Sequence, residues 1–255
     1  MDLVCLNRRS ALGLGAAAAA SLVGPARASP ASPPVVVELF TSQGCSSCPP
    51  ADAFMGELVG KPNVIGLSLN VDYWDYIGWR DTLASPANTK RQYEYAKKRG
   101  DNRVYTPQMV INGHRHVIGS DRPEVLRMIA EESRRTARSV VELSIANLGG
   151  QMSVSVGPAP SDMLRKESAL LLITLLPVVT VEIEKGENSG TQVSYFNVVR
   201  RIMPIGMWQG DASSVRLPKE DLLSDSLEGC VCLLQMAQSG HIIGAATWGM
   251  RPRQS

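Results

Sequence analysis

In the first half of the chain, apolar runs typical of strands alternate with segments typical of helices. Residues 35–40 (Val-Val-Val-Glu-Leu-Phe) and 63–71 are nearly continuous apolar runs, as expected of buried strands. Between them, Pro49-Pro50 opens a helix that is expected to run to about Val59. Proline is tolerated there because the first N–H groups of a helix have no intrahelical partner.

The same pattern predicts a second helix, a hairpin and a third helix. The expected elements are a helix at 86–99 stopped by Gly100, strands at 108–111 and 115–118 joined by Asn112-Gly113, and a helix capped by Ser120 or Asp121. The resulting order is β-α-β-α-β-β-α. Right-handed crossovers predict that the first three strands are parallel and that the hairpin is antiparallel.

From about residue 139 the pattern changes to long strand-like runs with no comparable helix. These runs cover residues 140–146, 151–156, 169–184, 191–203 and 230–247. We therefore expect an α/β domain at 35–138, followed by a mostly antiparallel, β-sandwich-like domain at 139–255.

The first 28 residues have the pattern of an export signal. Arg8-Arg9 is followed by an alanine-rich apolar stretch and by the cleavage-site pattern Ala26-Arg27-Ala28. The paired arginines resemble a twin-arginine signal, and an ordinary secretory signal is the alternative. The apolar stretch is too short for a membrane anchor. We expect cleavage near residue 28, a linker at 29–34, and a periplasmic or secreted bacterial protein.

Charge and cysteine content narrow the function classes. Removal of residues 1–28 takes away three arginines and one aspartate, which leaves 23 basic and 23 acidic residues. This balance does not suggest nucleic acid as a partner. Four cysteines remain, too few for a disulfide-stapled scaffold but suited to catalysis in a compartment where disulfides persist. No cofactor motif is found, and the oligomeric state cannot be inferred.

Cys45-Ser46-Ser47-Cys48 is the main candidate for chemistry. It stands between the first strand and the first helix, where unpaired N–H groups and the helix dipole favour a thiolate. A second cysteine three residues later can close or resolve a disulfide. Half of a zinc site has the same spacing, so the motif alone leaves a metal-binding role open.

Three other groups of residues have two or more interpretations each. Tyr73, Trp74 and Trp79 follow the second strand, where they either form a substrate-binding wall beside Cys45 or cover the core under a long loop.

Cys230 and Cys232 share one face of an expected strand as a redox pair, a soft metal site or two buried thiols. His114 and His116 have the spacing of a metal pair on a strand, but surface histidines are favoured, and no metal site is predicted.

The element order, with C-x-x-C after the first strand and Thr106-Pro107 before the third, resembles the thioredoxin superfamily. This resemblance implies that Pro107 is a cis-proline facing the cysteines, and that Thr106 offers backbone groups to an extended substrate. The family also has a buried acid beneath the cysteines. Glu38 stands near that position, offset by one residue, and is the candidate acceptor of the Cys48 proton.

A closer resemblance covers nearly the whole mature chain. The segments that carry it are 38–52, 71–75, 78–79, 105–108, 186–188 and 197–200. They are similar to a family of exported bacterial proteins known as domain of unknown function 1223, to which a thioredoxin-like fold is assigned. The resemblance implies a fold and no substrate.

These observations favour an exported thiol–disulfide oxidoreductase that acts on protein or small-molecule thiols and disulfides through Cys45 and Cys48. The alternatives are a thioredoxin-like module that delivers copper or zinc, and a binding protein in which Cys45–Cys48 is a structural disulfide.

Overall fold

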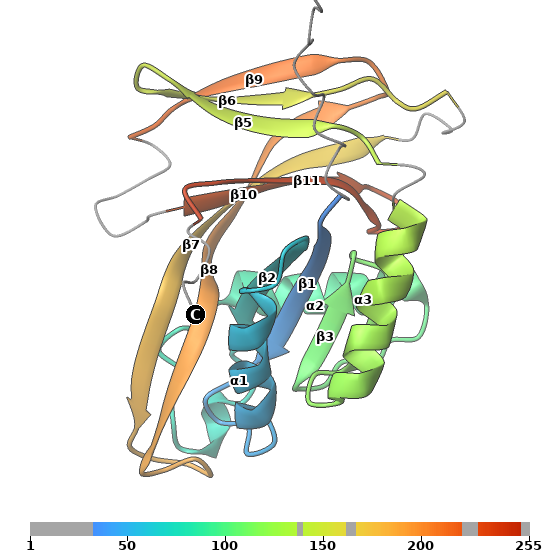
Figure 1. The fold of residues 1–255 in the computed structure, drawn as a ribbon. Helices are drawn as coiled ribbons and strands as arrows, with labels where there is room; N and C mark the ends of the chain where they lie inside the picture. Colours follow the sequence, from blue (N-terminus) through green and yellow to red (C-terminus); the bar gives the residue numbers. More distant parts are fainter. Residues whose placement is uncertain (1–32, 137–139, 162–166, 221–228, 251–255) are drawn as a thin grey trace, which may run out of the picture. The chain divides into compact units, whose positions relative to one another are not determined.

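An eight-stranded mixed sheet runs through both halves of the chain (Figure 1). The computed structural model describes residues 33–136, 140–161, 167–220 and 229–250. The predicted export signal and most of the predicted linker lie outside these ranges. The strand order in the large sheet is β11-β10-β7-β8-β2-β1-β3-β4, and a second sheet has the order β5-β6-β9.

The predicted strands and helices of the first half lie where the sequence pattern places them, within one or two residues at each predicted boundary. They are β1 (Val35–Thr41), α1 (Pro49–Leu58), β2 (Val64–Asn70), α2 (Pro86–Arg99), β3 (Gln108–Ile111), β4 (Arg115–Ile118) and α3 (Arg122–Thr136). The 3₁₀ turn η1 (Asp75–Ile77) in the loop after β2 is not among the predicted elements. Helix α2 is delimited at both ends. The Ser85 hydroxyl accepts a hydrogen bond from the Ala87 N–H, and Gly100 ends the helix at φ +78°.

The predicted direction of the third strand is wrong. β1 and β2 are parallel, but β3 runs antiparallel to β1. The reason is that the chain doubles back after α2. The Gln92 side chain, in the middle of α2, donates to the Tyr105 carbonyl and to the Gln108 side chain, so residues 100–107 return along the helix. β3 therefore begins beside the C-terminal end of β1, with Gln108 opposite Phe40.

The alternating side chains of β1 build two cores, one on each face of the sheet. Val37 and Leu39 pack with α1 and α3 on one face. Val36 and Phe40 pack on the other face, where Tyr95 of α2 forms an edge-on contact with Phe40. The helices thus cover both faces of the central strands (Figure 1).

The strands of the second half extend the same sheet. They are β5 (Leu143–Leu148), β6 (Gln151–Val156), β7 (Ser168–Ile183), β8 (Thr191–Trp208), β9 (Ser213–Pro218), β10 (Gly229–Met236) and β11 (Ile242–Trp248). β7 and β8 form a long antiparallel hairpin, and β8 also pairs with β2 through Ser68 and Val198.

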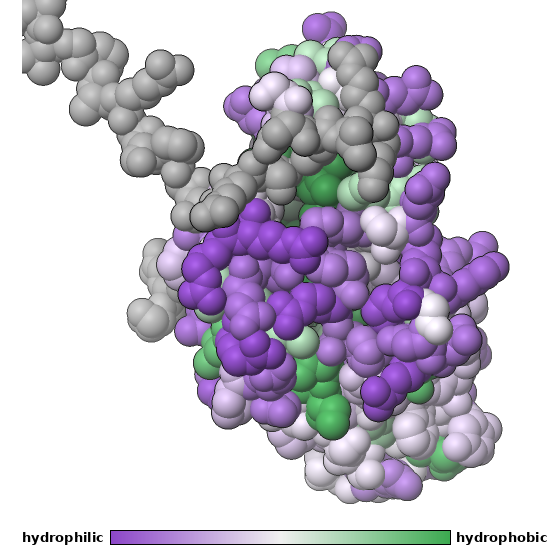
Figure 2. Space-filling view, turned by 90° about the vertical axis from the view of Figure 1, so that its right-hand side faces the viewer, coloured by the Kyte–Doolittle hydropathy of each residue, from purple (hydrophilic) through white to green (hydrophobic). Residues whose placement is uncertain are grey.

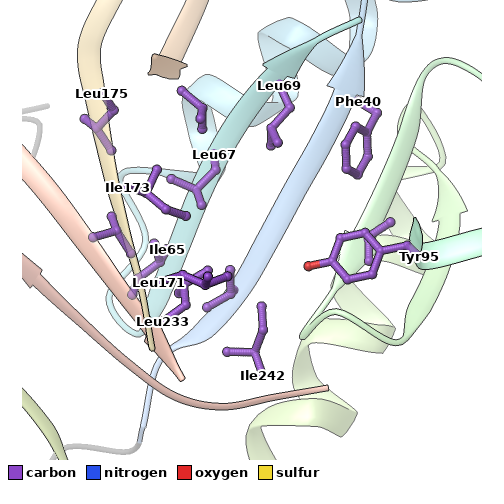
Figure 3. Close-up of a cluster of buried hydrophobic side chains, with 14 of the residues drawn as sticks. Phe40, Ile65, Leu67, Leu69, Tyr95, Leu171, Ile173, Leu175, Leu233 and Ile242 are labelled. Carbon is purple, nitrogen blue, oxygen red and sulfur yellow. The ribbon is translucent and has the colours of Figure 1, made fainter. Parts of the chain in front are cut away.

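One core joins the two halves that the sequence pattern separates. Figure 3 shows Ile65 and Leu67 of β2 beside Leu171 and Ile173 of β7, with Leu233 of β10 nearby. The described residues belong to one compact unit, so the change of pattern near residue 139 marks a change in strand and helix content within a shared sheet.

The three-stranded sheet packs over the far end of the large one, above β10 and β11 in Figure 1. Met152 and Val154 of β6 share a core with Leu170, Leu172 and the two cysteines of β10. This end of the molecule therefore has two facing sheets, as in a sandwich.

The face on which α3 lies is largely hydrophilic (Figure 2). On α3 itself, Arg127 pairs with Glu124 and Glu131. Within the described residues, no helix combines the length and the apolar character that crossing a bilayer requires.

Candidate functional site

Cys45 and Cys48 form a disulfide in the loop between β1 and α1. Two backbone turns shape this loop, because the Cys45 N–H donates to the Ser42 carbonyl and the Cys48 N–H donates to the Cys45 carbonyl, both at 3.1 Å. Cys48 is the N-cap residue of α1. The N-terminal end of the helix dipole is therefore directed at the cysteine pair, as the sequence predicts.

The disulfide is covered, with only 1% of Cys45 and none of Cys48 exposed to solvent. Part of the cover is the turn between β7 and β8. The Asn188 side-chain amide in that turn donates to the carbonyls of Gln43 (2.8 Å) and Cys45 (3.0 Å). Within residues 41–48, only Ser46 and Ser47 are exposed, and Ser47 Oγ lies 3.4 Å from Cys45 Sγ.

The long loop after β2 is tied to the same place through Gln43. The Gln43 side-chain oxygen accepts from Trp79 Nε1 at 2.8 Å, and the Gln43 N–H donates to Asp81 at 2.8 Å. Asp81 also accepts from Asn70 Nδ2, and burial raises the pKa of its carboxyl. The loop that carries the cysteines is thus hydrogen-bonded both to the β7–β8 turn and to the long loop after β2.

Asp52 is a buried acid that is not among the predicted site residues. It stands four residues after Cys48, on the same side of α1, and it is 1% exposed. Neither of its carboxylate oxygens has a hydrogen-bond partner among the described residues. Burial raises the pKa of Asp52 to about 8, and the nearby Asp81 charge reinforces this effect. An acidic residue at an apolar position of the helix was the signal available in the sequence.

Glu38, the predicted proton acceptor, is bound to other partners. It lies on the face of β1 that carries Val36 and Phe40, away from α1. Its carboxylate accepts from Arg91 Nε at 2.7 Å and from the Tyr95 hydroxyl. The offset of one residue therefore matters, because adjacent residues of a strand point to opposite faces.

The Thr106–Pro107 peptide bond is cis, as the resemblance implies. Trp74 connects this peptide to the cysteine loop. Its Nε1 donates to the Thr106 hydroxyl at 2.8 Å. A Cβ atom added to Gly44 would lie 3.2 Å from Trp74 Cβ, so the two residues are close neighbours. The first turn of α1 is also close. A Cβ atom added to Gly119 would lie 3.1 Å from the Ala51 Cβ and 3.2 Å from the Pro107 Cβ, so Gly119 lies against both residues.

The predicted aromatic residues make different contacts. The ring N–H groups of Trp74 and Trp79 donate hydrogen bonds to Thr106 and Gln43, in the loops around the cysteines. The Tyr73 hydroxyl is buried and has no hydrogen-bond partner in the described part of the chain, and burial raises its pKa to about 12. Tyr76, which is not among the predicted site residues, is 80% exposed and stacks on Trp74. The other three aromatic residues of this loop are partly buried.

Cys230 and Cys232 are free thiols in the core between the two sheets. Both are buried on the same face of β10, which pairs regularly with β7 at these positions. Burial raises the pKa of Cys230 to about 11 and that of Cys232 further, which disfavours the thiolate. Among the three interpretations of this pair, the geometry fits buried structural thiols.

His114 and His116, which have the spacing of a metal pair on a strand, do not form a pair with each other. His116 Nδ1 lies 2.8 Å from the Tyr105 hydroxyl, and His116 Nε2 lies 3.0 Å from Asp101. His114 instead lies beside Glu132 and His241.

The fold and the site together define an α/β protein with a covered C-x-x-C disulfide at the start of a helix and a cis-proline loop beside it. The chain belongs to the family described as "protein of unknown function (DUF1223)", whose model matches residues 36–235. No match was found among curated proteins.

Solved structures similar to this chain include the following two. Protein AGR_C_4864 from Agrobacterium tumefaciens is 36% identical, with a TM-score of 0.74, and the match covers 87% of this chain and 96% of that one. HBP35 of Porphyromonas gingivalis is 13% identical, with a TM-score of 0.59, and the match covers 86% of this chain and 76% of that one. The second likeness concerns the fold alone.

Proposed function

We propose that this protein is an exported thiol–disulfide oxidoreductase with a thioredoxin-like active site, acting on protein or small-molecule thiols and disulfides. The observation that carries the proposal is the Cys45–Cys48 disulfide at the N-terminus of α1, with Trp74 linking the cysteine loop to the cis Thr106–Pro107 loop. The export signal expected at residues 1–28 would bring the pair to a compartment where disulfides persist.

The reaction starts from the reduced pair in one direction. The Cys45 thiolate attacks one sulfur of a substrate disulfide, the substrate S–S bond breaks, and one substrate thiolate leaves. The Cys48 thiol then loses its proton and attacks Cys45 Sγ. The mixed disulfide breaks, the second substrate thiolate leaves, and the Cys45–Cys48 disulfide is formed. Two electrons pass to the substrate, and the reverse sequence oxidises a substrate dithiol.

Asp52 is suited to handle the proton of this step. Its carboxyl is buried one helical turn after Cys48, and a pKa of about 8 places it between acid and base near neutral pH. As a carboxylate it accepts the Cys48 proton during resolution. As a carboxylic acid it returns a proton to the Cys48 thiolate during reduction of the disulfide.

Substrate must reach a disulfide that is covered. The exposed Tyr76 ring and the exposed Ser46-Ser47 segment mark the surface from which it approaches. The β7–β8 turn lies over the cysteine loop through the two hydrogen bonds of Asn188. Movement of this turn would expose Cys45 and its backbone to an extended substrate held along Thr106 and Pro107.

A Cys48→Ala variant tests the proposal, because it leaves Cys45 without its resolving partner. We expect it to accumulate mixed disulfides with exported proteins that a reductant releases, and we expect a Cys45→Ala variant to accumulate far fewer. Cys232→Ala is the matched control, since that thiol is buried in a different core. Stoichiometric metal held by Cys45 and Cys48, with no trapped partner, would contradict the proposal and support a metal-delivery module.

A structural disulfide is the second candidate, and the burial of both cysteines favours it. A covered disulfide that joins the start of α1 to the preceding turn would stabilise the loop without turnover. The two candidates differ in whether the disulfide exchanges with external thiols while the protein stays folded.

A further inference from the structure

Three side chains from distant parts of the sequence meet at the edge of the sheet where β1 begins. They are His114 in the β3–β4 turn, Glu132 on α3 and His241 in the β10–β11 turn. One potential ligand atom from each lies within 4.8 Å of those of the other two. His114 Nε2 lies 3.4 Å from Glu132 Oε1, and the two imidazole centroids are 4.3 Å apart.

The backbone holds the two histidine-bearing turns against each other. Gly113 and Gly240 both have a left-handed conformation, and a Cβ on Gly113 would lie 2.1 Å from the Gly240 carbonyl oxygen. The Asn112 carbonyl accepts from the Ile242 N–H at 2.9 Å. The Asn112 side chain accepts from the Val36 N–H, also at 2.9 Å. The positions of both histidines are therefore fixed by the fold.

The hydrogen bonds of His114 direct a lone pair toward the carboxylate. His114 Nδ1 lies 3.2 Å from the Asn112 carbonyl oxygen, which only accepts, so this nitrogen carries the proton. Nε2 lies 3.4 Å from Glu132 Oε1, so in the neutral tautomer its lone pair would face the carboxylate. A neutral imidazole and a carboxylate at this distance can share a cation, either a proton or a metal ion. A ring nitrogen bonded to a backbone carbonyl is also the usual second-sphere arrangement of a histidine that binds metal.

His241 and Glu132 supply the other two potential ligands. The His241 side chain is half-buried, and its imidazole centroid lies 4.3 Å from that of His114. The side chain of Glu132 is only 2% exposed. One carboxylate and two imidazoles form the His₂Glu ligand set found in zinc proteins.

We propose that His114, Glu132 and His241 form a binding site for a divalent transition metal ion, with Zn²⁺ as the best fit. Zinc bonds of about 2.0–2.1 Å in a tetrahedral site place ligand atoms about 3.3 Å apart. The distance between His114 and Glu132 already has this value. Three protein ligands leave the fourth position to water, because the side chain of His114 is 20% exposed.

Arg135 is the side chain that a bound cation has to displace. Its Nη1 lies 3.4 Å from His114 Nε2 and 4.0 Å from Glu132 Oε1. The Arg135 side chain is 63% exposed, so it can turn into solvent. Arg115 lies 3.6 Å from the same Glu132 oxygen, but it also pairs with Glu131 at 2.8 Å. Removal of the Arg135 charge is therefore expected to strengthen metal binding.

This site is separate from the cysteine pair. β1 extends from Val35, beside the histidine turns, to Thr41, beside the cysteine loop. Seven residues of strand correspond to about 20 Å. Metal binding here can be present or absent whichever function the disulfide has.

Titration of the purified, oxidised protein with Zn²⁺ in a calorimeter tests the site. We expect one saturable equivalent, a loss of affinity of about 100-fold or more in His241→Ala and in Glu132→Gln, and unchanged affinity in His116→Ala. Arg135→Ala is expected to bind Zn²⁺ more tightly than the unmodified protein.

Imidazole NMR signals of the unmodified protein give a second measurement that does not depend on any variant folding. Zn²⁺ should shift the ring signals of His114 and His241 and leave those of His116 in place. The proposal is wrong if the unmodified protein shows no saturable binding, if only His116 responds, or if His241→Ala retains full affinity.

Discussion

At the scale of single residues, the contrast between Asp52 and Glu38 shows what the sequence conceals. Both carboxylates are buried. Glu38 has Arg91 as a direct ionic partner, whereas Asp52 has no hydrogen-bond partner among the described residues. A pattern of apolar positions identifies which residues are buried. It does not show which buried acid has a partner, because the partner belongs to another element.

The raised pKa of Asp52 predicts a specific dependence of stability on pH. Below about pH 4 the carboxyl is protonated in both the folded and the unfolded chain. Between pH 4 and 8 the unfolded chain releases this proton and the folded protein keeps it, because the folded pKa is about 8. The contribution of Asp52 to the free energy of unfolding therefore falls as pH rises through this window, by about 1.4 kcal/mol per pH unit.

An Asp52→Asn variant should remove this slope. We expect its free energy of unfolding, relative to that of the unmodified protein, to increase from pH 4 to pH 8 and to level off above pH 8. Urea unfolding at a series of pH values measures it. A pH-independent difference between the two proteins would show that Asp52 titrates normally and would remove its proposed part in proton transfer.

At the scale of elements, the β7–β8 hairpin reaches from the β-rich part of the chain to the cysteine loop. Its turn residue Asn188 donates to the backbone of Gln43 and Cys45. The sequence contains a signal for this contact only as a motif, Gly186-Glu187-Asn188, which stands more than 130 residues from Cys48. Long-range pairing of this kind depends on the register of the whole sheet.

An Asn188→Ala variant should uncover the disulfide. We expect dithiothreitol to reduce Cys45–Cys48 several-fold faster in the folded variant, because both hydrogen bonds to the loop are lost. Ser189→Ala is the matched control, since its hydroxyl donates to Glu184 within the turn. Equal reduction rates in Asn188→Ala and the unmodified protein would show that this turn does not limit access.

The contact between the β3–β4 and β10–β11 turns allows a test of element packing. Gly113→Ala places a Cβ 2.1 Å from the Gly240 carbonyl and also requires φ +72°. We expect a loss of at least about 3 kcal/mol in the free energy of unfolding. Gly149→Ala, at φ +58° in open space, should cost about 1 kcal/mol. Similar losses in the two variants would contradict the close approach of the turns.

At the scale of the whole molecule, the eight-stranded sheet makes the two halves interdependent. Ile65 and Leu67 of β2 pack against Leu171 and Ile173 of β7 (Figure 3). A chain ending at residue 138 would expose this face of β2 and leave the edge that pairs with β8 open.

We therefore expect the fragment of residues 29–138 to lack a stable fold, whereas the chain of residues 29–255 folds. Amide NMR spectra of the two proteins measure the difference through their chemical-shift dispersion. A well-dispersed spectrum and cooperative unfolding of the fragment would show that the first half is an independent domain.

The sequence predicts the elements of this protein better than their arrangement. Strand and helix positions follow from local periodicity, and the cysteine pair follows from its place between a strand and a helix. The direction of β3 does not, because it depends on the return of residues 100–107 along α2. The partners of His114 do not either, since Glu132 and His241 come from elements that only the folded chain brings together.

The reduction potential of the Cys45–Cys48 pair, measured by equilibration with glutathione buffers, tests the proposed function most directly. A pair that exchanges with substrates is predicted to have a potential between about −270 and −120 mV, the range of thiol–disulfide oxidoreductases. The value within that range indicates whether the protein mainly reduces or oxidises its substrates. A potential below about −300 mV would contradict the proposed function, because it is typical of structural disulfides that do not exchange.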